Sequence, residues 1–162
     1  MPQLWTIRRA RPEDYDEIYP LEVLLVSLHH AARPDYFREP ADCYPPAEYQ
    51  ALLACPGAIA LVAEADGHPV GLCFGRVEDK AGNTVCRPRR IAMLEDLIVR
   101  PDWRGRGIAA ALLECAKAEA VRLGACSLEL CVWPFSGDAL RLYEGLGLRT
   151  QYTRLELPLD AD

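Results

Sequence analysis

A turn with two glycines, Gly105 and Gly107, separates an apolar stretch from a helical one and constrains the fold more than any other part of the chain. The residues 94–99 before this turn predict a strand. The residues 108–123 after it predict a helix, and Gly124 stands where a left-handed C-terminal cap would end that helix. The chain must therefore place a strand end and a helix start side by side.

The composition of this turn favours an anionic ligand. The first N–H groups of a helix have no partner within the helix and carry partial positive charge. Because glycine has no Cβ, an anion can approach these groups closely. Arg104 and Arg106 add full positive charge beside them. The sequence therefore predicts a pyrophosphate-binding site at the turn.

The size and charge of the chain restrict the class of protein. Its 162 residues suffice for one domain, residues 1–162, with a sizeable core. The formal net charge of −6 argues against nucleic acid as a partner and favours a cationic small substrate over an anionic one. No apolar run approaches the ~20 residues of a membrane span, and the N-terminus lacks the apolar region of a signal peptide. We therefore expect a cytoplasmic protein without a membrane partner.

The cysteines indicate a reducing environment. There are seven of them without any Cys-x-x-Cys pair, and five lie in apolar or helical stretches. The three histidines have no ligand spacing with them. This pattern favours buried free thiols over disulfides or zinc ligands, so we expect no metal site.

Apolar periodicity predicts strands and helices along the whole chain. We expect strands at 4–9, 58–65, 70–77, 91–99, 126–133 and one or two within 148–159, and helices at 12–30, 47–54, 108–123 and from Ser136 or Asp138 to Gly147. Pro20 is expected to kink or interrupt the first helix, and residues 66–69 are expected to close a hairpin. The order of these elements predicts a mixed α/β fold with helices on one sheet.

Two interpretations of the turn can be weighed against the rest of the sequence. Residues 105–110 fit G-x-G-x-x-A, the dinucleotide fingerprint. A dinucleotide fold needs several further strand–helix units, but fewer than 55 residues remain after this segment. The acidic residue expected downstream corresponds to Glu129, which lies inside a strand rather than at its end. A purely structural turn is the second alternative, against which the two flanking arginines argue.

Two segments of the chain resemble the GNAT N-acetyltransferase superfamily. Arg104-Gly105-Arg106-Gly107-Ile108-Ala109 matches the acyl-CoA signature Q/R-x-x-G-x-G/A of that family. Ala139-Leu140-Arg141-Leu142-Tyr143-Glu144-Gly145-Leu146-Gly147-Leu148 resembles its A-x-x-x-Y-x-x-x-G-F motif, with leucine in the last position. The order and separation also agree. Leu94-Glu95-Asp96 followed by R-G-x-G-I is also similar to the diamine and polyamine acetyltransferases, although this similarity is weaker than that to the superfamily.

This resemblance implies the fold and the cofactor. The fold would be a single α/β domain with a central, mostly antiparallel sheet and helices on both faces. Acetyl-CoA would be the cosubstrate, without a metal. The residues that would bind it are Leu97, Ile98, Val99, Arg104, Gly105, Arg106, Gly107, Ile108, Ala109, Ala110, Ser136 and Tyr143. Ser136 stands where many members carry asparagine, and its shorter side chain reaches less far.

Tyr143 is the candidate general acid. It lies on the apolar face of the last predicted helix, so its ring points to the core or to a cleft rather than to water. The alternative is a core tyrosine with a satisfied hydroxyl. The resemblance favours the acid, which would protonate the leaving thiolate of CoA.

Glu95 is the candidate general base, acting directly or through a water molecule. An amine of pKa ~10.4 must lose a proton before it attacks a thioester. Alternation places Glu95 among apolar residues on one strand face and Asp96 on the other, and an unpaired carboxylate there is costly. The alternative role for Glu95 is an ion pair with a neighbour such as Arg90. Asp96 is the reserve candidate for the base.

The acceptor is expected to be the primary amine of a small molecule. The resemblance places its pocket within residues 28–49, where Tyr36, Phe37 and Tyr44 are candidate lining residues. By family habit alone, a homodimer is implied. The alternative function is a catalytically silent acyl-CoA-binding module that regulates a partner.

Overall fold

The computed structural model describes residues 4–159. The chain groups into two compact units, Met1–Cys131 and Val132–Asp162, and each is described by itself. The expectation of one domain over residues 1–162 stays a prediction. Among the described residues, no helix has both the length and the apolar composition needed to cross a membrane.

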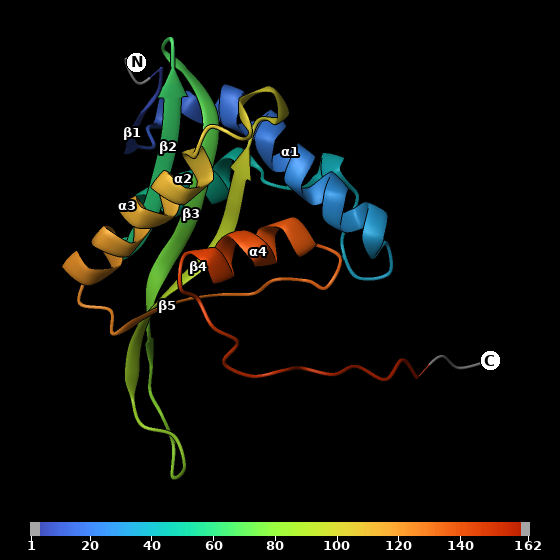
Figure 1. Cartoon of the computed structure of the whole chain (residues 1–162), viewed down its shortest axis with the longest axis vertical. Helices are drawn as coiled ribbons and strands as arrows, with labels where there is room; N and C mark the ends of the chain where they lie inside the picture. The colour runs from blue at the N-terminus through green and yellow to red at the C-terminus, as the bar shows by residue number, and fades with distance from the viewer. Residues whose placement is uncertain (1–3, 160–162) are drawn as a thin grey trace. The chain divides into compact units, whose positions relative to one another are not determined.

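The first unit is built on a five-stranded sheet with the strand order β1-β2-β3-β4-β5 (Figure 1). Its strands are β1 Thr6–Arg9, β2 Ala58–Ala65, β3 His68–Lys80, β4 Arg89–Val99 and β5 Ser127–Leu130. The three pairs from β1 to β4 are antiparallel, and only β4 and β5 run parallel. The predicted mixed α/β class with a mostly antiparallel sheet is therefore confirmed.

The helices of the first unit cover the two faces of its sheet. They are α1 Tyr15–Ala32, α2 Pro46–Ala54 and α3 Ile108–Arg122, and the same unit contains the 3₁₀ turns η1 Pro12–Asp14, η2 Pro40–Asp42 and η3 Pro101–Trp103. The second unit contains α4 Gly137–Gly145. Because β4 and β5 are parallel, the chain must cross over between them, and α3 forms that crossover.

Alternation along the strands divides the core between the two faces. The face toward α1 and α2 buries Ile18, Leu21 and Tyr49 against side chains of the central strands, which are Val62, Leu72, Phe74 and Ile98. Each such side chain contributes about 1.5–3 kcal/mol by burial. On the other face β3 approaches α3 closely, because a Cβ on Gly71 would lie 3.4 Å from Cγ2 of Ile108. The site elements thus rest on a packed sheet.

The start of α1 is fixed by an ionic cluster. Arg8 donates two hydrogen bonds to the Asp14 carboxylate, of 2.7 and 2.8 Å, and also pairs with Glu64 on β2. Asp14 accepts a further bond of 2.7 Å from the Arg11 N–H. Burial opposes ionisation of Asp14, but the Arg8 and Arg11 hydrogen bonds outweigh it and hold the pKa of this carboxyl below its usual value.

Two local expectations are corrected by the structure. Pro20 does not interrupt the first helix, because α1 begins only at Tyr15 and continues through the proline to Ala32. No strand forms at 148–159 among the described residues, although the alternation there is clear. Alternation indicates a strand only where a neighbouring strand supplies hydrogen-bond partners.

The cysteines are all free, as expected, but they are not all buried. Cys73 is buried, whereas Cys86, Cys126 and Cys131 are exposed. Cys86 lies in the polar loop between β3 and β4, and Cys126 and Cys131 flank the short strand β5. Cys126 and Cys131 thus have apolar sequence neighbours, but they are exposed because they lie at the ends of a short strand.

Candidate active site

The two-glycine turn leads directly into the N-terminus of α3. Gly105 and Gly107 have φ values of +74° and +77°, a left-handed conformation that side chains rarely adopt. A Cβ at either position would meet no atom within 4 Å, so the space above the turn is open. The first α3 hydrogen bond runs from the Ala111 N–H to the Gly107 carbonyl, at 3.0 Å. The N–H groups that precede it are those a pyrophosphate would need.

The arginines of the turn are held by neighbouring backbone and aromatic groups. Arg104 donates from Nε to the Val99 carbonyl at 3.1 Å. The guanidinium of Arg106 lies 4.4 Å from the centroid of the Trp103 ring. It also donates to the Asp102 carbonyl at 3.4 Å. Both cations are therefore fixed beside the open helix N-terminus.

The strand β4 separates from β5 before it reaches the turn. β5 pairs with β4 only over Ile91–Leu94, so β4 continues through Val99 without it. The Arg100 N–H donates to the Val70 carbonyl at 2.8 Å, and the register then makes Leu72 and Ile98 a hydrogen-bonded pair. In such a ladder the backbone groups of Leu97 and Val99 point away from β3, toward the side that β5 leaves open.

This register sharpens the prediction for pantetheine. Leu97 and Val99 have the backbone direction that a strand-like ligand needs, whereas the N–H and C=O of Ile98 face β3. The Val99 carbonyl is already bonded to Arg104, which leaves its N–H and both groups of Leu97 for a ligand. Ile98 was expected to take part through its backbone, and its register argues against that.

A β-bulge in β4 brings two neighbouring carboxylates to the same pocket. Phe74 pairs with Asp96, but Gly75 pairs with Leu94, so Glu95 is the extra residue. Glycine is required at position 75, since a Cβ there would clash with the Met93 carbonyl. Simple alternation predicted Glu95 and Asp96 on opposite faces. That prediction was wrong, because the bulge resets the alternation and both residues line one pocket.

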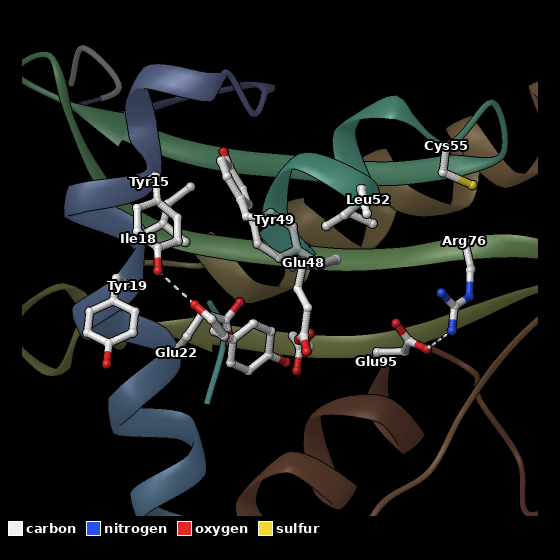
Figure 2. Close-up of a pocket in the computed structure, with 14 residues that line it drawn as sticks. Tyr15, Ile18, Tyr19, Glu22, Glu48, Tyr49, Leu52, Cys55, Arg76 and Glu95 are labelled. Carbon is white, nitrogen blue, oxygen red and sulfur yellow. Dashed lines mark hydrogen bonds and ion pairs between the residues drawn. The ribbon is translucent and has the colours of Figure 1, made fainter. Parts of the chain in front are cut away.

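This pocket lies within the first unit and has a volume of about 370 Å³. Figure 2 shows that its wall is contributed by α1, α2 and the strands β3 and β4. The lining residues are Tyr15, Ile18, Tyr19, Glu22, Tyr44, Glu48, Tyr49, Ala51, Leu52, Cys55, Phe74, Arg76, Glu95 and Asp96. Of the three aromatic residues expected to line an acceptor pocket, Tyr44 does so.

Tyr36 and Phe37 do not line this pocket. Their rings pack edge to face at 5.1 Å, and Phe37 also packs on His29 at 4.9 Å. The guanidinium of Arg33 lies 5.6 Å from the Tyr36 ring centroid. These contacts hold the loop after α1 together, so the prediction that Tyr36 and Phe37 contact the acceptor finds no support in the pocket.

Glu95 forms an ion pair, but with a different partner from the one expected. Its carboxylate accepts a hydrogen bond of 2.9 Å from Arg76 on β3, as Figure 2 shows. Arg90 instead pairs with Asp79, at 2.8 Å. The Glu95 side chain is 42% exposed, so it lies at the wet side of the pocket. Its charge is therefore solvated as well as paired.

Asp96 is the more enclosed carboxylate of the two. Burial raises its pKa to about 6, although a hydrogen bond from Tyr44 acts in the opposite direction. Tyr44 has a φ of +54°, which is strained for a tyrosine, and its carbonyl accepts a 2.7 Å bond from the Tyr15 hydroxyl. The strained loop thus positions a phenol on Asp96.

Glu22 on α1 is a site residue that the sequence analysis missed. It is 1% exposed, and burial together with the charge on Asp96 raises its pKa to about 9. The missed signal was helical spacing, since Glu22 follows the core residue Ile18 by four positions and therefore shares its face. An acidic residue on an apolar helix face is unusual enough to mark a candidate site.

Tyr143 and Ser136 belong to the second unit. Tyr143 lies on α4 and is half-buried. Ser136 is the residue that precedes α4, but its side chain makes no capping hydrogen bond. Gly147 ends this region with a φ of +89°, and the next N–H, of Leu148, donates to the Tyr143 carbonyl at 3.0 Å. The predicted helix and its glycine terminator are both present.

Comparison with known proteins now identifies the family. The model of the acetyltransferase (GNAT) family matches residues 25–148. The chain belongs to this family, and its class is therefore that of the acetyl-CoA-dependent N-acetyltransferases. No curated protein matches the chain by sequence.

Solved structures agree with this assignment. A mutant of the BH1408 protein from Bacillus halodurans is 26% identical, with a TM-score of 0.90 over 95% of this chain and 99% of that one. An acetyltransferase from Trypanosoma brucei is 20% identical, with a TM-score of 0.70 over 96% and 99%. The aminoglycoside N-acetyltransferase AAC(6')-Iy, solved with CoA, is 17% identical, with a TM-score of 0.73 over 96% and 100%. The last two support the fold.

Proposed function

We propose that this protein transfers the acetyl group of acetyl-CoA to the amine of a small molecule by direct attack. The observation that carries the proposal is the position of the acidic pocket. It ends at the bulge residues Glu95 and Asp96, and the next residue, Leu97, begins the part of β4 whose backbone is open to a ligand. An acceptor in the pocket and a donor along β4 would therefore meet at the bulge.

The backbone groups and arginines of the donor side suit the parts of acetyl-CoA. The thioester supplies an activated acetyl group. Leu97 and Val99 would hold the pantetheine arm by their backbone groups, and the N–H groups of residues 107–110 would hold the pyrophosphate. Arg104 and Arg106 would add charge to that site.

We assign the removal of the amine proton to Glu95. Of the two bulge carboxylates it has the greater access to water, so a proton taken through one water molecule can leave to solvent. Arg76 orients the carboxylate by its 2.9 Å bond. Asp96 is the alternative base, with Tyr44 holding one of its oxygens.

We assign the return of a proton to the CoA thiolate to Tyr143, on the resemblance of its helix to the family motif. A phenol of pKa ~10 gives its proton to a thiolate of pKa ~8.5 at a cost of about 2 kcal/mol. The tyrosine is half-buried, so water does not fully solvate its ring. Such a cost is small against a typical activation barrier.

A free-thiol release assay tests the proposal. The protein is incubated with acetyl-CoA and each member of a panel of primary amines at pH 7.5. We expect thiol release that depends on the amine, and an acetylated amine detected by mass spectrometry. If CoA stabilises the protein in a thermal shift assay but no amine accelerates thiol release, the silent acyl-CoA-binding module is the correct function.

A further inference from the structure

Glu22 is a buried carboxyl group without a partner. Neither of its oxygens has a hydrogen-bond partner among the described residues, although the residue is 1% exposed. Its neighbours on the same helix face, Ile18 and Leu21, belong to the apolar core. An unsatisfied buried carboxyl group destabilises a fold, and groups of this kind in native structures require an explanation.

The carboxyl group faces a pocket that is rich in negative charge. Figure 2 shows Glu22 on α1 opposite the residues contributed by α2 and β4. The one arginine of the pocket lining, Arg76, is paired with Glu95. The other charged or titratable groups that line the pocket or interact with Asp96 come from every element around it. They are Tyr15, Tyr19 and His29 of α1, Tyr44 of the loop, Glu48 and Tyr49 of α2, Cys55 after α2, Cys73 and Arg76 of β3, and Glu95 of β4.

Glu22 and Asp96 interact across this pocket and share one charge near neutral pH. The charge on Asp96 contributes to the raised pKa of Glu22, which is about 9, whereas the pKa of Asp96 is about 6. Glu22 is therefore protonated and Asp96 ionised at pH 7.5. A cation between them would stabilise both carboxylates and would cause Glu22 to release its proton.

We propose that Glu22 and Asp96 form a subsite for a second, non-reacting ammonium group of the acceptor. The subsite consists of a buried, unpartnered carboxyl group from α1 and a carboxylate from β4 that Tyr44 orients. The acceptor class is a compact molecule with two cationic nitrogens. This inference rests on the proposed acetyl transfer and specifies its substrate.

The nitrogen in this subsite cannot be the one that is acetylated. Two carboxylates in an enclosed site stabilise the charged ammonium, whereas only the neutral amine attacks a thioester. The reacting nitrogen must lie where its proton can leave, which is near the more exposed Glu95. The two needs are met by two nitrogens of one acceptor, each beside a different carboxylate of the same pocket.

Three amines of matched length test this subsite in acetyl transfer. They are 1,4-diaminobutane, 4-amino-1-butanol and butylamine, in which the second ammonium is replaced by a hydroxyl or a methyl group. Losing one member of a buried charge pair lowers affinity at least ~30-fold, so we expect kcat/KM to favour the diamine by at least that factor. Equal values for the three amines would overturn the proposal.

The variant Glu22→Gln isolates the role of the carboxylate. It keeps the size of the side chain but cannot ionise, so we expect the ratio of kcat/KM for the diamine to that for butylamine to fall below ~3-fold. Glu17→Gln, an exposed position of the same helix outside the pocket, is the matched control and should keep the wild-type preference. A diamine preference that survives in Glu22→Gln would contradict the proposal.

Proton release provides a second readout that does not need turnover. Calorimetric titration of 1,4-diaminobutane into the protein at pH 7.5, in two buffers of different ionisation enthalpy, should show release of about one proton in the wild type and none in Glu22→Gln. Binding without proton release would overturn the subsite. If the diamine binds with proton release but no amine is acetylated, the subsite stands and the proposed acetyl transfer fails.

A third variant guards against a folding defect. Glu22→Met replaces the carboxyl group by an apolar side chain of similar length, which should raise the Tm because it removes an unsatisfied buried group. We expect this variant to lose the diamine preference while it gains stability. A Tm that falls in both Glu22→Met and Glu22→Gln would identify Glu22 as a structural residue instead.

Discussion

The donor and acceptor sides of this site are built from different parts of the chain. The proposed donor side uses backbone, namely the open edge of β4 at Leu97 and Val99 and the N-terminus of α3. The acceptor side uses side chains that come from α1, α2, β3 and β4. Backbone recognition serves one fixed cofactor, whereas side chains can be exchanged without changing the fold. The comparison explains why the donor is identifiable and the acceptor must be argued from charge.

The largest expected effect concerns acetyl transfer itself, in which the donor and the acceptor both take part. Tyr143→Phe removes the proposed acid and should lower kcat ~10²-fold or more, while the affinity for CoA changes little. Steady-state kinetics together with CoA titration measure both quantities. Tyr152→Phe, an exposed tyrosine of the same unit, is the control. Unchanged turnover in Tyr143→Phe would remove this residue from the mechanism.

The next effect belongs to the acceptor side. Glu95→Gln should lower kcat/KM for the amine ~10²-fold and abolish the acidic limb of its pH profile, because the proposed base can no longer take up a proton. Glu78→Gln is a matched control, since Glu78 also bonds Arg76, at 3.3 Å, but does not line the pocket. If the acidic limb persists in Glu95→Gln, the base is Asp96 or another group.

A substitution at the turn should affect only the donor side. Gly107→Val places a β-branched residue at a φ of +77° and covers the N–H groups of the turn. We expect loss of about 2 kcal/mol of CoA binding, or ~30-fold in Kd by calorimetry. Gly124→Val imposes comparable strain at a φ of +80°, at the other end of α3. Equal losses in both variants would show that strain, rather than the turn, is responsible.

The smallest expected effect is on stability and its pH dependence. The pKa of Asp14 is held low, so its ionised form stabilises the fold above its ordinary pKa near 3.8, and this contribution is lost as pH falls through the lower, native value. Asp14→Asn should cost about 1.5 kcal/mol at pH 7 and less at pH 3. Urea unfolding at both pH values measures the difference.

Asp16→Asn is the matched control for this measurement, because Asp16 is exposed on the first turn of α1. Since α1 carries Glu22 and two of the pocket tyrosines, Tyr15 and Tyr19, we also expect Asp14→Asn to raise the KM for the amine before it weakens CoA binding. A loss at pH 3 as large as that at pH 7 would show that the Arg8–Asp14 pair does not stabilise the native state.

The sequence predicted the strand, turn and helix of the proposed donor side well because these elements are local. Strand, glycine turn and helix follow one another within residues 89–122, so periodicity and glycine positions suffice to place them. Glu129, which the dinucleotide interpretation required, bonds to Arg89 at 2.8 Å and to Ser127 at 2.9 Å. Those bonds hold the Glu129 carboxylate within the sheet, where it is not available to a ribose hydroxyl. This position argues against the dinucleotide interpretation.

The acceptor side was predicted less well because it depends on tertiary contacts. The β-bulge at Glu95 follows from a register shift between β3 and β4, which periodicity within one strand does not reveal. The pairing of Glu95 with Arg76 and the approach of Glu22 to Asp96 join segments far apart in the sequence. The net charge of −6 favoured a cationic substrate, but it could not indicate which carboxylates would line one pocket.

The early end of β5 would give a bound cofactor a structural role in the sheet. An amide-bearing arm laid along Leu97 and Val99 would act as a temporary sixth strand, continuing the edge of β4 from which β5 has departed. Hydrogen exchange should then slow at the amides of Leu97 and Val99 when CoA binds. The Ile98 amide, already bonded within the sheet, should report no change. Loading the donor would thus complete the sheet as well as supply the acetyl group.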